Sequence, residues 1–397
     1  MSYQGYATVG AVRSPLRRLR ARLRRLFARS GGLRRARAYP EPPAYLFFCV
    51  NGAGLGHLNR SLAVARRVRR LQPDADICFL TSSRMLDAIS REGYVPYYFP
   101  PIASYGGRMK AKYWEDRMLY THIRLIVELH KPTTLVYDGI SLYPGLSRAV
   151  RNFGFDRTAM ILRLRHTHSR LAEVSKDFRL FDHIIHPGEA GESRAGVPSP
   201  AEQLQPRRVA PILYFDRGEI LPQAEARQQL LLPMERRVVY LQLGSGNIDD
   251  AVTWTGHALE LLSHYPEVEV VLAQSPIASR EVVPPPGVHL LRQYPNARFF
   301  NGFDFAISAA GYNTVHELLF FGVPAILIPM ARVTDDQEAR ARAVERAGAA
   351  MVVKRPEELA DALARVMDDE ILARLRNSAQ HLIPVNGADE AAHVISN

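Results

Sequence analysis

Short apolar runs alternate along this chain with longer stretches in which apolar residues recur at helical spacing. Residues 45–50, 77–81 and 133–137 are runs with the length and composition of buried strands. Residues 58–71 and 113–130 carry apolar residues every three or four positions, which predicts helices. Because regular alternation of strands and helices is typical of parallel sheets wrapped by helices, we expect an α/β fold.

The clearest pattern lies between residues 303 and 350. An apolar run at 303–308 breaks near Gly311 and continues into a predicted helix. A second strand at 325–329, a loop and a helix at 335–347 repeat this arrangement. Strand-to-helix turns expose backbone N–H groups at the carboxyl edge of a parallel sheet, where such groups can hold a phosphate. We therefore expect an anion site around Gly311.

Changes in composition divide the chain into segments. A polar stretch rich in Pro, Gly and Ser ends near residue 205, and a new unit of strands and helices follows it. With 397 residues, 47% of them hydrophobic, the chain can bury two cores. We expect a basic arm at 1–40, an amino-terminal domain at 41–205, a linker at 206–222, a carboxyl-terminal domain at 223–385 and a final helix at 386–397.

The excess positive charge lies in the arm. Residues 1–40 contain 11 Arg and neither Lys nor acidic residues, and the formal net charge of the whole chain is +11. Leucines recur there at helical spacing, so residues 13–37 predict a basic amphipathic helix suited to an anionic membrane surface. A disordered arm that binds an acidic partner and a targeting peptide are alternatives. Nucleic acid is not expected, because the arm lacks an interleaved series of aromatic residues to stack on bases.

Cysteine usage and hydropathy bear on the compartment. Cys49 and Cys78 fall in predicted strands, where we expect them to pack as small apolar groups rather than form a disulfide. This fits a reducing, cytoplasmic setting. Wholly apolar runs, such as the one that includes 320–331, are short of the roughly 20 residues that cross a bilayer, so we expect no membrane span.

The sequence GLGHLNR, residues 54–60, follows the first predicted strand. Its glycine spacing departs from the dinucleotide fingerprint and no acidic residue ends the next strand, so we do not expect an NAD site. His57 follows the glycine turn directly, and histidine is the side chain most often used for proton transfer, which makes it a candidate general base for a hydroxyl group. A histidine there can instead serve only to hold the loop. Asp138, which ends another predicted strand, is the second candidate base.

The run SAAGYNTVHELLFFGVPAILIP, residues 308–329, together with DDQ at 335–337 and ERAGAA at 345–350, resembles the donor domain of GT-B glycosyltransferases. The resemblance is closest to the MurG-like group of family 28. It implies two Rossmann-like domains whose parallel sheets face each other across a cleft, with the last helix crossing back to the first domain. It also implies inverting transfer of a hexose-type sugar from a UDP-sugar to a hydroxyl acceptor that is lipid-linked or close to a membrane.

The same resemblance assigns roles to individual residues. It implies diphosphate contacts at Gly311, Asn313 and Thr314, a ribose contact at Glu317, a base contact at Gln293 and donor-sugar contacts at Asp336 and Gln337. A glycine turn after the predicted strand at 238–243 resembles the family's GGS-type loop and adds Ser245 and Gly246. We also assign Gly54 and Gly56, which flank the turn before His57, to the diphosphate site.

Several of these residues have structural interpretations as well. Thr314 and Glu317 form the T-x-x-E pattern of a capping box. Asp335 and Asp336 would stabilise a helix N-terminus in any protein. The glycines near residue 245 would also suit a plain turn.

Two histidines bear on whether the chain binds a metal ion. His166 and His168 could contribute to a metal site, although polar residues at a strand end explain them more simply. We expect neither metal nor cofactor, because the helix N-termini after Gly246 and Gly311 can stabilise a leaving diphosphate.

The motif GxGHxxR at 54–60 also resembles the UDP-sugar hydrolases of pseudaminic acid synthesis, in which the histidine activates water. A UDP-sugar hydrolase and a non-catalytic nucleotide-sugar-binding subunit are therefore alternatives to the transferase. We favour a transferase on the inner face of the cell membrane, because a basic arm would hold it near a lipid-linked acceptor.

Overall fold

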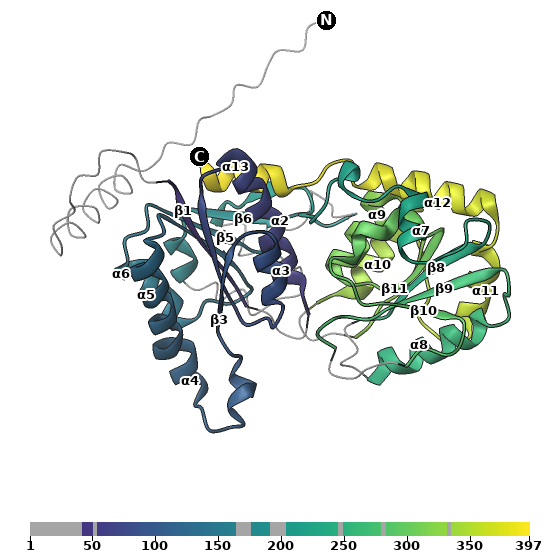
Figure 1. Ribbon diagram of the computed structural model, residues 1–397, viewed down its shortest axis with the longest axis horizontal. Coiled ribbons are helices and arrows are strands. Elements are labelled where there is room, and N and C mark those ends of the chain that lie inside the picture. Colours follow the sequence, from purple (N-terminus) through teal and green to yellow (C-terminus); the bar gives the residue numbers. More distant parts are fainter. Residues whose placement is uncertain are drawn as a thin grey trace, which may run out of the picture.

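The chain forms two α/β domains that lie side by side (Figure 1). The computed structural model describes residues 42–50, 54–163, 176–190, 204–244, 249–278, 283–331 and 335–397. The basic arm at 1–40 and its expected membrane helix lie outside these residues. Within the described ranges, none of the helices combines the length and apolar character that crossing a bilayer requires.

The first domain is built on a parallel sheet with the strand order β3-β2-β1-β4-β5-β6-β7. Its strands are β1 (Ala44–Cys49), β2 (Asp76–Thr81), β3 (Val95–Tyr98), β4 (Thr134–Asp138), β5 (Arg157–Ile161), β6 (His183–Pro187) and β7 (Arg207–Val209). Its helices are α2 (Gly56–Leu71), α3 (Leu86–Arg91), α4 (Ala111–Tyr113), α5 (Leu119–His130) and α6 (Pro144–Asn152). A π-helical turn, Trp114–Met118, joins α4 to α5 where the sequence predicted one helix over 113–130.

The second domain contains a parallel sheet with the order β10-β9-β8-β11-β12-β13. Its strands are β8 (Arg237–Gln242), β9 (Val268–Ala273), β10 (Val288–Leu291), β11 (Phe305–Ala309), β12 (Ala325–Ile328) and β13 (Met351–Val352). Its helices are α7 (Gln223–Gln229), α8 (Asp249–Leu262), α9 (Tyr312–Phe321), α10 (Gln337–Arg346), α11 (Glu358–Val366) and α12 (Asp369–Leu382).

Both sheets are covered on both faces, which explains why their strands read as continuous apolar runs. In β1, Phe47 belongs to the core on one face, whereas its neighbour Phe48 belongs to the core on the other. Cys49 and Cys78 are buried free thiols, as the sequence predicted. The predicted α/β fold with two parallel sheets is confirmed.

Each sheet has one point where the strand order reverses, and these points position the site. In the first domain β1 lies between β2 and β4, and Cys49 is in register with Asp138. In the second domain β8 lies between β9 and β11, and Ser308 is in register with Gln242. The chain diverges to opposite faces at such a point and leaves a crevice beyond the carboxyl ends of the strands, where α/β sheets bind their ligands.

The last helix, α13 (Ala388–Ser396), packs on the first domain although it follows the second in sequence. Ala391, Ala392 and Ile395 of α13 share a core with Leu62 and Ala65 of α2. Figure 1 shows this carboxyl-terminal helix beside α2. The two domains are therefore joined by two chain crossings, one before α7 and one before α13.

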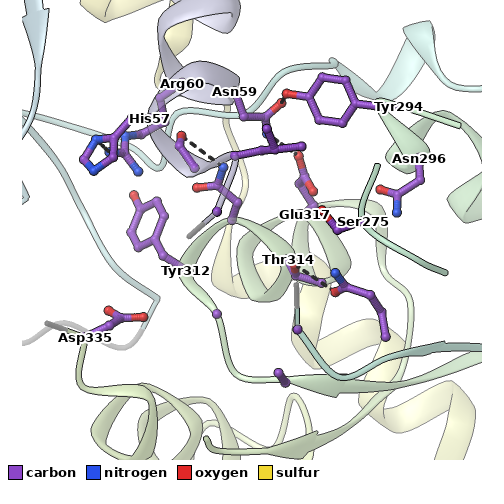
Figure 2. A pocket seen from close by; sticks show the side chains of 18 of the residues that line it. His57, Asn59, Arg60, Ser275, Tyr294, Asn296, Tyr312, Thr314, Glu317 and Asp335 are labelled. Carbon is purple, nitrogen blue, oxygen red and sulfur yellow. Dashed lines mark hydrogen bonds between the residues drawn. The ribbon is translucent and has the colours of Figure 1, made fainter. Parts of the chain in front are cut away.

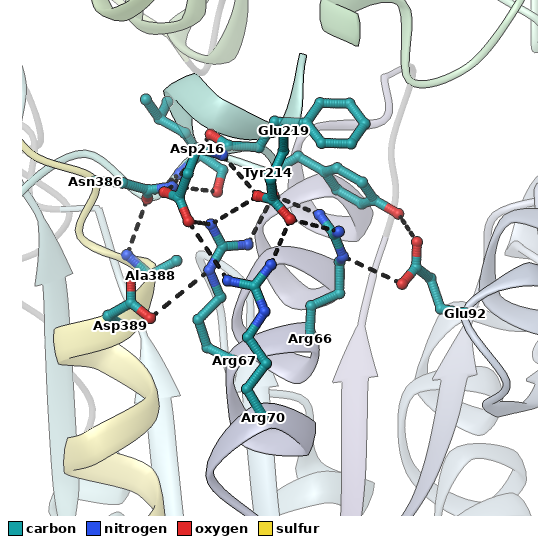
Figure 3. Close-up of polar contacts among 12 residues, drawn as sticks. Arg66, Arg67, Arg70, Glu92, Tyr214, Asp216, Glu219, Asn386, Ala388 and Asp389 are labelled. Atoms are coloured by element: carbon teal, nitrogen blue, oxygen red, sulfur yellow. Dashed lines mark hydrogen bonds and ion pairs between the residues drawn. The ribbon is translucent and has the colours of Figure 1, made fainter. Parts of the chain in front are cut away.

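The two crossings are tied together by polar side chains (Figure 3). Asn386 donates to the carbonyl oxygen of Leu213 at 3.0 Å and to Asp216 at 2.9 Å, and its own carbonyl accepts from the Leu213 N–H. Asp216 in turn forms an ion pair of 2.7 Å with Arg67 of α2, which is fully buried. The expected linker, 206–222, is partly wrong, because its residues Arg207–Val209 form β7 and pair with β6.

Candidate active site

A cavity of about 430 Å³ lies where the carboxyl edges of the two sheets face each other (Figure 2). The first domain lines it with the turn before α2 and with the residues that follow β4. The second domain lines it with Gly244 after β8 and with the turn between β11 and α9. The crevices of both sheets thus open into one cavity, as expected of a ligand site between two such domains.

His57 lies in the first turn of α2 beside the end of β4. Its Nδ1 atom is 2.7 Å from Oδ1 of Asp138. Arg60, one turn further along α2, donates to the two oxygens of the same carboxylate at 2.8 and 3.0 Å. Burial by itself would raise the pKa of Asp138, but the charges and hydrogen bonds of Arg60 and His57 lower this pKa below its ordinary value. Asp138 is therefore an ionised carboxylate.

This arrangement determines which ring nitrogen of His57 carries the proton. An ionised carboxylate only accepts hydrogen bonds, so Nδ1 donates to Asp138, and in the neutral ring the lone pair is on Nε2. The interpretation of Asp138 as a second candidate base is not supported, because its side chain is fully buried and paired with Arg60. Asp138 instead orients the imidazole, and His57 is the group that can accept a proton.

The turn before α9 presents open backbone N–H groups to the cavity. Gly311 is the N-cap residue of α9, and it has no side chain that could cap this end of the helix. The capping-box interpretation of Thr314 and Glu317 is wrong, because both lie inside α9. Thr314 instead contacts Gln242 at 3.4 Å, and Asn313 donates to the carbonyl oxygen of Gly56 at 3.3 Å. The helix N-terminus is left available for an anion.

Glu317 is a buried carboxyl group on the face of α9 that lines the cavity. Burial raises its pKa to about 7, although a hydrogen bond from Asn59 acts in the opposite direction. Asn59 Nδ2 donates to Glu317 Oε1 at 3.0 Å from the other domain. A buried carboxyl with one partner retains capacity to accept from a ligand, which suits it to hydroxyl groups such as those of a ribose.

Three consecutive residues before and at the start of α10 have different roles. Asp336 is the N-cap residue of α10 and accepts from the N–H of Ala339 at 2.9 Å. Asp335 and Gln337 line the cavity, whereas Asp336 is not among its lining residues. Gln337 is held in place because its Oε1 accepts from the N–H of Met330 at 3.0 Å. The structure therefore places Asp335, rather than Asp336, with Gln337 in the cavity lining.

Asp335 is held by two arginines, one from each domain. Arg340 of α10 donates to it at 2.8 Å, and Arg163, which follows β5 in the first domain, donates at 3.0 Å. Burial alone would raise the pKa of Asp335, but both guanidinium groups lower it below the ordinary range. The side chain of Arg163 also lies over the ring of Tyr312, 4.0 Å from its centre. Sequence reasoning missed Arg163, and no motif marks it.

Comparison with known proteins connects this geometry to a family. Residues 297–394 match the glycosyltransferase family 28 C-terminal domain. The chain is 23% identical over 389 residues to the UDP-N-acetylglucosamine–N-acetylmuramyl-(pentapeptide) pyrophosphoryl-undecaprenol N-acetylglucosamine transferase of Acetivibrio thermocellus, covering 87% of this chain and 96% of that one. The enzyme of the same name from Rhodospirillum centenum is 51% identical over 59 residues, which is 15% of this chain and 16% of its own.

Solved structures show the same fold. The kitacinnamycin glycotransferase superimposes with a TM-score of 0.63 at 18% identity, over 90% of this chain and 99% of that one. Acinetobacter baumannii MurG superimposes with a TM-score of 0.57 at 16% identity, over 89% and 99%. The chain is thus similar to MurG and related glycosyltransferases over most of its length. Its fold is GT-B, as the residues around Gly311 led us to expect.

The remaining expected site residues fall into two groups. Gly54, Gly56 and Gln293 line the cavity. Ser245 and Gly246, like His166 and His168, lie outside the described residues. Among the residues that are described, no group of three His, Cys, Asp or Glu side chains has the arrangement of a metal site.

Proposed function

We propose that the protein transfers a sugar from a UDP-sugar to a hydroxyl group of a lipid-linked acceptor at a membrane surface. The observation that carries this proposal is the position of His57 opposite the N-terminus of α9 in one cavity. The relatives from Acetivibrio thermocellus and Rhodospirillum centenum are named as transferases that act on an undecaprenol-linked acceptor. Their names support a nucleotide-sugar donor and a lipid-linked acceptor for this chain.

The proposed reaction is a direct displacement. Nε2 of His57 takes the proton of the acceptor hydroxyl while its oxygen attacks the anomeric carbon of the sugar. The bond between that carbon and the diphosphate oxygen breaks, and UDP leaves with the electron pair. Attack from the side opposite the leaving group inverts the anomeric configuration. Asp138 stabilises the imidazolium that forms, because its carboxylate accepts from Nδ1.

The second domain would hold the donor. The open N–H groups at the start of α9 would bind the diphosphate and stabilise the charge that develops on it, without a metal ion. Glu317 would bind the ribose, Gln293 would lie beside the base, and Asp335 with Gln337 would bind the sugar. Hexose-type donors fit this set, because a carboxylate and an amide together accept from and donate to neighbouring hydroxyl groups.

The proposed setting is the inner face of the cytoplasmic membrane. The 11 arginines within residues 1–40 would attract anionic lipids, each contributing about 1 kcal/mol near the surface. Co-sedimentation with vesicles of anionic phospholipid, with and without residues 1–38, tests this part. Equal partitioning of both forms would remove the arm from the proposal.

One experiment separates the proposed transferase from the other activities. The protein is incubated with a panel of UDP-sugars, first alone and then with a membrane extract that supplies acceptor, and release of UDP is measured. Release that requires the extract supports the transferase. Rapid release without it indicates a hydrolase, and binding without release in either condition indicates a non-catalytic subunit.

A further inference from the structure

Asn59 bridges two residues of the opposite domain from the first turn of α2 (Figure 2). Its Nδ2 lies 3.0 Å from Glu317 Oε1, and its Oδ1 lies 3.1 Å from the hydroxyl oxygen of Tyr294. Asn59 and Glu317 are each only 7% exposed. One amide side chain thus joins the helix that carries His57 to the carboxyl on α9 and to the segment that follows β10.

The chemistry of the partners fixes the orientation of this amide. An ionised carboxylate can only accept, so the NH₂ group of Asn59 must face Glu317. The amide oxygen then faces Tyr294, whose hydroxyl donates to it. An aspartate at position 59 could still accept from the Tyr294 hydroxyl, but it could not donate to the Glu317 carboxylate. Among the described residues, Asn59 is the side chain that donates to the Glu317 carboxylate.

We propose that Asn59 is a positioning residue for the donor nucleotide: it holds the Glu317 carboxylate in place for the ribose and ties ribose binding to the helix that carries His57. This inference rests on the proposed function. Asn59 lies two residues after His57 and directly before Arg60, which binds Asp138. A ribose held by Glu317 is therefore linked through a single amide to the helical turn that presents the base.

The energetic role of the bridge follows from burial. Burial opposes ionisation of Glu317, and the hydrogen bond from Asn59 favours it. Without that donor, the carboxyl group loses both its fixed orientation and part of the stabilisation of its charge. Removing this donor should therefore weaken the binding of ligands that contact Glu317 and leave the binding of other ligands unchanged.

The test compares binding of UDP with binding of 2′,3′-dideoxyuridine diphosphate, which lacks the ribose hydroxyl groups. The dissociation constant of the dideoxy compound divided by that of UDP measures how strongly the ribose hydroxyl groups are recognised. Asn59→Asp should reduce this ratio about tenfold at pH 8, as expected for loss of a hydrogen bond to a charged group. The reduction should be smaller at pH 6, because the two neighbouring carboxyls then share a proton.

Two further variants make the test specific. Tyr294→Phe removes the other hydrogen bond of the same amide and should leave the ratio within about threefold, since the bond to Glu317 remains. Asn59→Ser removes both bonds without adding a charge and should also lower the ratio. It replaces Asn59→Asp if thermal melting shows that the aspartate variant does not fold.

The outcomes distinguish the inference from the function on which it rests. If the unaltered protein binds UDP but the ratio is unchanged in Asn59→Asp and Asn59→Ser, Asn59 does not position Glu317. The same conclusion follows if Tyr294→Phe lowers the ratio as much as Asn59→Ser, because the amide would then be a structural bridge only. Failure of the unaltered protein to bind UDP overturns both proposals.

Discussion

The Nδ1 atom of His57 lies 2.7 Å from Oδ1 of Asp138, although 81 positions separate them in the chain. The contact forms because the turn after β1 and the end of β4 are neighbours at the switch point of the first sheet. It assigns one proton position on the imidazole, and in the neutral ring it leaves the lone pair on Nε2. The proposed base depends on this pair.

Substitutions in the pair should separate chemistry from binding. We expect His57→Ala to lower turnover about 100-fold or more, since general base catalysis is lost, while the dissociation constant for UDP changes by less than about threefold. Asp138→Asn should lower turnover to a similar extent, because an amide cannot stabilise the imidazolium. Turnover with a fixed acceptor preparation and calorimetric UDP binding measure the two effects. Unchanged turnover in His57→Ala would reject the base.

The buried carboxyl of Glu317 should make stability depend on pH. Its pKa is raised from 4.5 to about 7, so its contribution to stability is fully present below pH 4.5 and is lost as the pH rises through about 7. Glu317→Gln cannot lose a proton, and we expect it to be more stable than the unaltered protein at pH 8 by on the order of 3 kcal/mol. At pH 5 the two proteins should unfold at similar temperatures. Equal differences at both pH values would contradict this.

The same substitution at Asp335 and at Asp336 should show which of the two side chains contacts the donor sugar. Asp335→Asn should raise the KM for the donor about tenfold, because the carboxylate that Arg163 and Arg340 hold in the cavity is lost. Asp336→Asn should change the KM less than about twofold and the stability by less than about 0.5 kcal/mol, since asparagine is also a good N-cap. The reverse pattern would return the sugar contact to Asp336.

Asn386 should contribute to the stability of the protein through its hydrogen bonds to the backbone of Leu213. Asn386→Ala leaves the N–H and carbonyl of Leu213 without this partner, so we expect a loss of about 2–3 kcal/mol in unfolding free energy. Arg70→Ala serves as the control, because Arg70 is 48% exposed and its ion pair with Glu219 should contribute less than about 1 kcal/mol. Urea unfolding of both variants measures the difference. Equal losses would indicate that the crossing is not specifically held by Asn386.

Local patterns predicted the elements that position the site. The strands predicted at 45–50, 133–137 and 238–243 lie within one residue of β1, β4 and β8, because buried parallel strands appear in a sequence as short continuous apolar runs. The prediction of a capping box at Thr314 was wrong because Gly311, three residues earlier, is the N-cap residue of α9. A local motif can be matched in sequence while the chain starts its helix elsewhere.

Long-range contacts account for what sequence reasoning missed. Arg163, Asp335 and Asn59 each have a hydrogen-bond partner in the other domain, far along the chain. The choice between Asp335 and Asp336 depends on where α10 begins. Asp336 caps this helix through the N–H of Ala339, whereas Asp335, one residue earlier, lines the cavity.

By itself, the sequence determined the class of fold, the two sheets and the glycine turn at Gly311 that lines the cavity, because hydrophobic periodicity and glycine turns act over a few residues. Only the tertiary structure decided which carboxylate orients His57, which aspartate reaches the cavity and which residue holds Glu317. Those roles depend on distances between segments separated by tens to hundreds of positions, and such distances are set by how the sheets and helices pack.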